Sequence, residues 1–396
     1  MKIADVQTFS IKVPPPARGG GAWHFVKITA DNGLHGWGEM AFLGANGGRS
    51  QSLADEVRDL SARFLIGENP LRREWIWNRF YEGAMSGHPD YIRGSVLSAL
   101  DIALWDIAGK HFGAPVYELL GGAVRDRVRA YSYIYHDPKR PEHAGFDGSW
   151  PLWLEPELCA QRAAEMAAEG FTALKLDPIN SGPTWGDPAR PWQLSLQELD
   201  RAEKTIRLMR ESLGSECDIL IGTHGQMTPA AAVRLAKRLE PYDPLWFEEP
   251  VPPESAKEMA TVKAKTTIPV ATGERLFSVH DFMPLLETRA ADILQPDLGS
   301  CGGISQCRKI AAMAEPFYVQ IAPHVWGGPG ITAAALQVAA SIPNFLILES
   351  IYKSDGFFNE ILTEPFQWED GCLVVPERAG IGIDFDENAL KENKLP

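Results

Sequence analysis

The feature that most constrains the fold is a regular alternation of short apolar segments and amphipathic helices, which begins near residue 128. Segments 230–239 and 304–314, for example, have helical periodicity and lie between apolar runs. The runs are aliphatic or β-branched, which is typical of strands buried on both faces. Eight such strands joined by crossovers predict an α/β fold with a parallel barrel. The expected strands are 129–135, 173–177, 218–221, 245–248, 269–272, 292–295, 319–322 and 345–349.

The two ends of the chain have a different pattern. Segments 6–13 and 23–29 resemble hairpin strands, and 52–65 and 95–111 have helical periodicity. The N-terminal part therefore reads as an α+β unit, and the C-terminal tail returns to turns and short strands that should pack back on it. The predicted domains are residues 1–127, 128–363 and 364–396.

Composition limits the classes of partner. The chain has 396 residues and a formal net charge of −14, which disfavours nucleic acid and anionic membranes because their phosphates would be repelled. No apolar run approaches the roughly 18 residues of a membrane span, and the N-terminus lacks an apolar signal core. Five scattered cysteines read as reduced thiols. We expect a cytoplasmic protein.

Charged or titratable residues follow the expected strands at regular intervals. In a parallel barrel the functional site lies at the carboxyl ends of the strands. From Glu248 onward these residues are spaced by 23 to 27 positions, close to one strand, loop and helix unit. Converging charges would repel one another without a cation or substrate between them, so the pattern indicates a functional site. Its members are Lys175, Asp177, His224, Glu248, Glu249, Glu274, Asp297, His324 and Glu349.

The residue types suggest metal binding and proton transfer. Glu248 and Glu274 supply hard oxygen ligands on neighbouring strands, which suit Mg²⁺. Asp297 and His324 can form a dyad in which the carboxylate orients an imidazole that acts as a general base. Lys175 could stabilise an oxyanion or act as a base. A simple salt bridge between the side chains of residues 175 and 177 is the alternative.

Several motifs together resemble the enolase superfamily in its mandelate racemase branch, especially the sugar-acid dehydratases similar to galactonate dehydratase. The resemblance covers nearly the whole chain and rests on S-A-L-D-I-A-L-W-D-I-A-G-K, G-F-T-A-L-K-L-D-P, W-F-E-E-P, I-P-V-A-T-G-E-R, I-L-Q-P-D and I-A-P-H. It implies a modified TIM barrel, (β/α)7β, beneath an N-terminal capping domain that the C-terminal tail completes. It also implies that a base removes the proton α to a substrate carboxylate and that Mg²⁺ stabilises the resulting enediolate.

The resemblance assigns roles to individual positions. Glu248 and Glu274 fall on the second and third metal ligands, and Asp297 with His324 on the base dyad. Glu349 falls on a residue that hydrogen-bonds the substrate carboxylate. His224 falls on the acid that protonates a departing hydroxyl, which favours dehydration because β-elimination needs a second proton donor.

Two positions depart from the family pattern. Asp177 stands where a second lysine often serves as the opposite base, which weakens a two-base racemase interpretation. Gly222 stands where the first metal ligand is expected, so Mg²⁺ binding should be weakened. Three explanations remain open: water, substrate or Asp177 fills the gap; His224 becomes a ligand; or metal binding and activity have been lost.

The substrate is expected to be an acid sugar. A loop with Arg18, Trp23 and His24, together with the stretch 82–93 that includes His88, would form a lid over the barrel in this architecture, and Asp177 is placed with these substrate-binding residues. Polar and aromatic side chains suit a hydroxylated acid. The resulting hypothesis is an aldonate or aldarate dehydratase that forms a 2-keto-3-deoxy acid and assembles as a homo-oligomer. The alternatives are an isomerase, cycloisomerase or epimerase using the same enediolate, and a metal-free, inactive binding protein.

Overall fold

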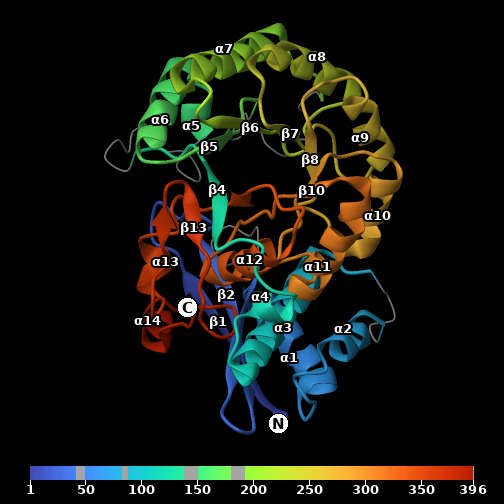
Figure 1. Cartoon of the computed structure of the whole chain (residues 1–396), viewed down its shortest axis with the longest axis vertical. Coiled ribbons are helices and arrows are strands. Elements are labelled where there is room, and N and C mark those ends of the chain that lie inside the picture. The colour runs from blue at the N-terminus through green and yellow to red at the C-terminus, as the bar shows by residue number, and fades with distance from the viewer. Residues whose placement is uncertain (42–49, 83–87, 138–149, 180–191, 396) are drawn as a thin grey trace.

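The N-terminal region is an antiparallel three-stranded sheet covered by a long helix. The computed structural model of the chain describes residues 1–41, 50–82, 88–137, 150–179 and 192–395 (Figure 1). A Cβ atom at Gly38 would lie 1.9 Å from the carbonyl oxygen of Ala99, so the third strand needs glycine where the long helix packs on it. The elements are β1 (Ile3–Lys12), β2 (Ala22–Ala30), β3 (His35–Met40), α1 (Ser50–Leu60), the π-helical turn η2 (Ser61–Leu65), α2 (Arg73–Glu82), α3 (Tyr91–Phe112) and α4 (Val116–Leu119).

The central region contains the alternating strands and helices that the sequence predicts. Its strands are β4 (Arg127–Tyr133), β5 (Ala173–Leu176), β6 (Asp218–Gly222), β7 (Trp246–Glu248), β8 (Val270–Thr272), β9 (Ile293–Leu294), β10 (Gln320–Ile321) and β11 (Leu348–Glu349). Strands β4 to β10 pair in sequence order and in parallel, and β11 pairs in parallel with β4. Ile321 of β10 also forms a parallel bridge with Phe345, just ahead of β11. The strand order thus returns to its starting point, and the predicted parallel α/β architecture is confirmed.

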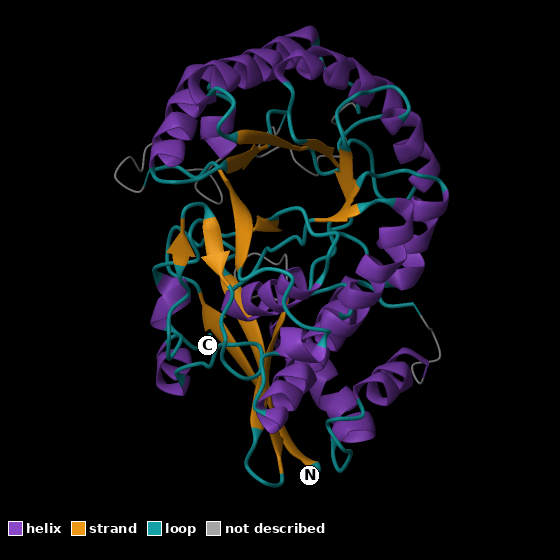
Figure 2. Ribbon diagram, viewed as in Figure 1, coloured by secondary structure: helices purple, strands orange, loops and turns teal. Residues whose placement is uncertain are grey.

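Helices lie outside these strands (Figure 2). Their starts follow local sequence signals: the Ser195 hydroxyl accepts a hydrogen bond from the Glu198 amide at the start of α7, and Thr228 caps α8 in the same way. The helices and short 3₁₀ turns of this region are α5 (Trp150–Trp153), α6 (Pro156–Ala168), α7 (Leu196–Leu213), α8 (Pro229–Leu239), η5 (Glu240–Tyr242), α9 (Ala256–Lys263), α10 (Val279–Glu287), α11 (Gly303–Ala314), η6 (Glu315–Phe317) and α12 (Pro329–Ser341). Within the described residues, no helix is both long enough and apolar enough to cross a membrane.

The C-terminal tail contacts both regions. The chain after β11 contains α13 (Phe357–Glu360), and the tail itself contains β12 (Trp368–Glu369), β13 (Cys372–Val374) and α14 (Glu387–Glu392). Strand β13 pairs antiparallel with β4 of the central region. On the N-terminal side, the indole nitrogen of Trp37 donates to Asp384 at 2.7 Å, and Lys394 bridges to Ile11 of β1. The exact division into residues 1–127, 128–363 and 364–396 stays a prediction.

Buried carboxylates join the N-terminal region to the central one. Glu39 of β3 is fully buried and accepts hydrogen bonds from three backbone amides at the start of α12, those of Gly328, Gly330 and Ile331, at 2.5 to 3.0 Å. Asp101 of α3 accepts from the hydroxyl and amide of Ser305 at the start of α11. These contacts place the first turns of two helices that follow predicted site residues.

Candidate active site

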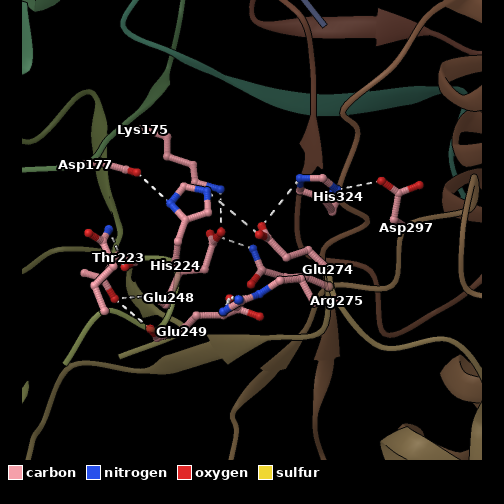
Figure 3. Close-up of polar contacts among 12 residues, drawn as sticks. Lys175, Asp177, Thr223, His224, Glu248, Glu249, Glu274, Arg275, Asp297 and His324 are labelled. Atoms are coloured by element: carbon pink, nitrogen blue, oxygen red, sulfur yellow. Dashed lines mark hydrogen bonds and ion pairs between the residues drawn. The ribbon is translucent and has the colours of Figure 1, made fainter. Parts of the chain in front are cut away.

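The carboxyl ends of the parallel strands bring the predicted charged side chains together in one buried cluster (Figure 3). Lys175 lies on β5, Glu248 ends β7 and Glu349 ends β11, while the remaining members follow the strands by one to three residues. Each of Lys175, Asp177, Glu248, Glu274, Asp297 and Glu349 is at most 8% exposed. The side chains that the sequence spacing predicts to lie together are therefore close to one another in the folded chain.

Five of these side chains form a continuous row across the site. His224 Nδ1 lies 2.7 Å from Asp177 Oδ2, and His224 Nε2 lies 3.8 Å from Glu274 Oε1. On the other side of Glu274, His324 Nε2 lies 3.5 Å from Oε2, while His324 Nδ1 lies 2.6 Å from Asp297 Oδ2. The order is thus Asp177, His224, Glu274, His324, Asp297, with an imidazole on each side of the central carboxylate (Figure 3).

The carboxylates set the protonation of both imidazoles. Burial acts to lower the pKa of His324, but the nearby Glu349 and Glu274 carboxylates outweigh it and raise the pKa to about 10. Burial likewise opposes the charge on His224, and Asp177 and Glu274 raise its pKa to about 9. In this arrangement both rings hold two protons at neutral pH. Burial alone would raise the pKa of Glu274, but the two imidazolium groups lower it.

Lys175 neutralises a second part of the cluster. Its Nζ lies 2.5 Å from Glu248 Oε1 and 3.8 Å from Glu349 Oε1. Burial opposes the ammonium charge, but these carboxylates outweigh it and raise the lysine pKa. The other oxygen of Glu248 accepts from Gln295 Nε2 at 2.8 Å and from the Trp246 indole at 3.0 Å. Burial raises the pKa of Glu248 to about 7 despite the lysine.

A neighbouring side chain fills the space next to Gly222. A Cβ atom built at Gly222 would lie 2.2 Å from Asp177 Oδ1 and 3.2 Å from Lys175 Cε. The Asp177 carboxylate therefore occupies the space into which a side chain at position 222 would project. Its Oδ1 also accepts from the Tyr133 hydroxyl at 3.2 Å. Two residues after the glycine, His224 has a positive φ of 47°, which is uncommon for a non-glycine residue and frequent at functional sites.

The donor chemistry of the cluster fits a hard cation. Glu274 is 8% exposed, and its Oε2 accepts no hydrogen bond from the described residues. Carboxylate oxygens of this kind are ligands that Mg²⁺ prefers. Over the same residues, no three His, Cys, Asp or Glu side chains are arranged to hold a metal together. Lys175 occupies Glu248 Oε1, so a cation shared by Glu248 and Glu274 would have to compete with the ammonium group.

Glu249, which follows Glu248 in the sequence, contacts Arg275 and not the row of five residues. Its side chain is buried and forms an ion pair with Arg275, whose Nε lies 2.8 Å from Oε2. The Thr223 hydroxyl donates to the Glu249 carbonyl at 2.7 Å, and Gly225 donates its amide to the same oxygen. Glu249 and Arg275 thus brace the ends of β6, β7 and β8 beneath the row of five residues.

The predicted substrate-binding residues of the N-terminal region are less closely grouped. The Arg18 guanidinium lies 4.7 Å from the ring centres of both Tyr135 and Tyr352, which follow β4 and β11 at the carboxyl side of the strands. Trp23 packs on the rings of Phe357 and Phe358. Arg18 therefore contacts residues that follow two of the strand ends, and its role in substrate binding stays a prediction.

Two histidines lie in other surroundings. His24 is buried in β2 with Nδ1 2.9 Å from the Ser10 hydroxyl, and burial lowers its pKa to about 4. The half-exposed side chain of His88 pairs with Asp281 of α10 at 3.0 Å. Among the described residues, the hydrogen bond of His24 and the ion pair of His88 do not join them to the row of five. Residues 83–87 of the predicted lid stretch lie outside the described part of the chain.

Tyr133, Gln295 and Glu39 were not identified from the sequence. Tyr133 ends β4, and the Lys175 ammonium lies 4.8 Å from its ring centre. Gln295 directly follows β9 and holds Glu248. Both occupy strand-end positions, so the same rule extended from charged to neutral polar residues would have found them. Glu39 does not follow a barrel strand, and its partners lie almost 300 residues later in the sequence, so no local pattern indicates its role.

Comparisons with known proteins agree with this architecture. Residues 11–121 match the family model described as the mandelate racemase/muconate lactonizing enzyme N-terminal domain, and residues 158–389 match the enolase C-terminal domain-like model. A D-galactonate dehydratase from Ralstonia pickettii is 36% identical, with 99% of this chain and 94% of the relative covered. A D-xylonate dehydratase from Haloferax volcanii is 32% identical, with 100% and 89% covered.

Solved structures of related proteins also superpose on the whole of this chain. A mandelate racemase/muconate lactonizing enzyme from Jannaschia sp. CCS1 superposes with a TM-score of 0.91 at 36% identity, covering 100% of this chain and 98% of the other. A related protein from Roseovarius sp. TM1035 gives 0.90 at 39% identity, with 100% and 96% covered. Because the matches span both regions at these identities, the chain belongs to the mandelate racemase/muconate lactonizing enzyme family of the enolase superfamily.

Proposed function

We propose that this protein is an acid-sugar dehydratase that removes the proton α to a substrate carboxylate and expels the β-hydroxyl as water. The observation that carries the proposal is the pair of imidazoles, His224 and His324, on the two sides of Glu274. β-Elimination needs one group to take a proton and another to give one. The relatives named D-galactonate and D-xylonate dehydratase support the same reaction class.

His324 is the proposed base. Its Nδ1 donates to Asp297, which fixes the ring and leaves Nε2 facing the site. With its pKa raised to about 10, the ring must lose the Nε2 proton before it can accept one from the substrate. The C–H electron pair then moves toward the carboxylate to give an enediolate.

His224 is the proposed acid. Its raised pKa of about 9 keeps a proton on the ring at neutral pH. When the enediolate collapses, the C–O bond breaks and the departing hydroxyl takes this proton from Nε2, leaving as water. The enol that remains tautomerises to the 2-keto-3-deoxy acid.

Lys175 and Glu349 complete the proposed carboxylate-binding end of the site. The Lys175 ammonium lies 2.5 Å from Glu248 and 3.8 Å from Glu349, and can offset charge that develops on the substrate carboxylate. Glu349 also accepts from the Val325 amide at 3.1 Å, next to His324. Glu248 and Glu274 are the residues that would hold Mg²⁺, which when bound would neutralise negative charge and polarise the substrate carboxylate.

The substrate proposed is an aldonate or aldarate. Arg18 at the strand ends, between two tyrosine rings, suits the polar end of a hydroxylated acid. The relatives' printed names include two aldonates, which makes the aldonates the first compounds to screen.

A keto-acid assay tests the proposal. The Mg²⁺-supplemented protein is incubated with a panel of aldonates and aldarates, and products are trapped with semicarbazide. A semicarbazone-forming product, absent with His324→Asn, would support dehydration. Substrate epimers without keto acid would favour the isomerase alternative, and binding without turnover or response to chelator would favour an inactive binding protein.

A further inference from the structure

We propose that Gly222 allows Asp177 to act as the positioning residue of His224, so that the site contains a second Asp–His dyad opposite the Asp297–His324 dyad. This inference rests on the proposed function of His224 as acid. It replaces the substrate-binding role predicted for Asp177, and it gives Gly222 a reason other than loss of a metal ligand.

The first step is the geometry of the two pairs. Asp177 Oδ2 lies 2.7 Å from Nδ1 of His224, and Asp297 Oδ2 lies 2.6 Å from Nδ1 of His324. In both pairs the carboxylate meets Nδ1, and Nε2 is the nitrogen that faces Glu274. A carboxylate on Nδ1 fixes the ring orientation and keeps the transferable proton on Nε2.

The second step is that the carboxylate is held in place. Asp177 is 1% exposed, and its other oxygen accepts from the Tyr133 hydroxyl. The two hydrogen bonds leave the short side chain little freedom to turn. His224 lies two residues beyond the end of β6 with a positive φ, and its contact with Asp177 orients the ring.

The third step is the requirement for glycine. Any side chain at position 222 would place its Cβ 2.2 Å from Asp177 Oδ1, a distance that forces the carboxylate to move. The absence of a side chain at position 222 and the contact between Asp177 and His224 are therefore parts of one arrangement. A methyl group at position 222 should have the same effect as removing the carboxylate.

Three variants test the proposal: Asp177→Asn, Gly222→Ala and, as a matched control on the same strand, Asp218→Asn. Asp218 lies at the opposite end of β6 and pairs with Arg129. Two rates are measured on an aldonate that the parent converts: exchange of the α-proton with solvent deuterium, and formation of keto acid. If Asp177 positions the acid, Asp177→Asn and Gly222→Ala lower keto-acid formation by about 100-fold and leave exchange near the parent rate.

A spectroscopic reading requires no substrate. Nδ1–H protons bonded to carboxylates resonate far downfield of the amides, so the parent should give one such signal for His224 and one for His324. Asp177→Asn and Gly222→Ala should remove only the former, and Asp218→Asn should keep both. This NMR measurement tests the Asp177–His224 dyad separately from the proposed dehydratase function, because it gives a result even if the keto-acid assay finds no substrate.

Two results would overturn the inference. Persistence of both downfield signals in Asp177→Asn would mean that His224 is oriented by another group. A parallel loss of exchange, elimination and calorimetric Mg²⁺ affinity in Asp177→Asn would mean that Asp177 is a metal ligand instead.

Discussion

His324 Nδ1 lies 2.6 Å from Asp297 Oδ2, so the aspartate directs the opposite nitrogen of the ring toward Glu274. Replacing His324 by Asn should lower α-proton exchange by about 10²- to 10⁴-fold, the usual contribution of a positioned general base. Deuterium incorporation into the substrate, followed by NMR, measures this. His111→Asn is a suitable control, because His111 is an exposed residue in the last turn of α3 and belongs to no predicted site. Exchange at the parent rate in His324→Asn would show that another group is the base.

Glu274 and Glu248 are proposed Mg²⁺ ligands, and this proposal can be tested by removing the metal and by changing a ligand. We expect chelator-treated protein to lose dehydratase activity and regain it with Mg²⁺. Calorimetry should show weaker Mg²⁺ binding in Glu274→Gln than in the parent, because an amide lacks the charge that Mg²⁺ prefers. Asp218→Asn, which changes a carboxylate at the other end of a strand, should bind as the parent does. Equal affinity in Glu274→Gln and parent would remove Glu274 from the ligand set.

Gly222→Asp should behave differently alone and in combination. Alone, the new side chain would compete with Asp177 for the same space, since the Cβ position is 2.2 Å from Oδ1. With Asp177→Asn added, the cluster keeps its total charge and has a carboxylate at position 222, where the family resemblance implies the first metal ligand. Calorimetry should therefore show a larger gain in Mg²⁺ affinity for the double variant than for Gly222→Asp. Equal gains would mean that the Asp177 carboxylate can move aside for the new side chain without reducing Mg²⁺ affinity.

The stability of metal-free protein should fall at alkaline pH. The folded pKa of His324 is raised to about 10 from an ordinary value of 6.5, so the folded state binds the proton more tightly than the unfolded state does. Its stabilisation is fully present below pH 6.5 and is lost as pH rises toward about 10. Thermal unfolding of the parent should therefore decline over this window more steeply than that of His324→Asn. Parallel profiles would contradict the raised pKa.

Glu39→Ala should destabilise the contact between the N-terminal and central regions. It would leave three buried backbone amides at the start of α12 without an acceptor, at a cost of about 1–3 kcal/mol for each unsatisfied group that water cannot reach. Chemical denaturation measures the loss of stability. Glu369→Ala, which removes an exposed ion pair with Arg127, should change stability by no more than about 1 kcal/mol. A similarly small effect for Glu39→Ala would mean that water replaces the carboxylate.

The sequence by itself determined the architecture and the members of the cluster. Strands such as 218–221 and 345–349 were predictable because apolar composition and turn residues are local properties. The spacing of Glu248, Glu274 and Asp297 was sufficient to place them together, because a parallel barrel brings successive strand ends to the same face.

Only the tertiary structure decided which of these side chains contact one another. Asp177 and His224 come from neighbouring strands, but their pairing depends on side-chain orientation and on the free space above Gly222, neither of which the sequence pattern specifies. Glu39 could not be linked to α12 from the sequence, because the two are brought together only when the N-terminal region packs on the central one. Local periodicity places residues at a strand end, whereas packing between distant segments determines the partner of each charge.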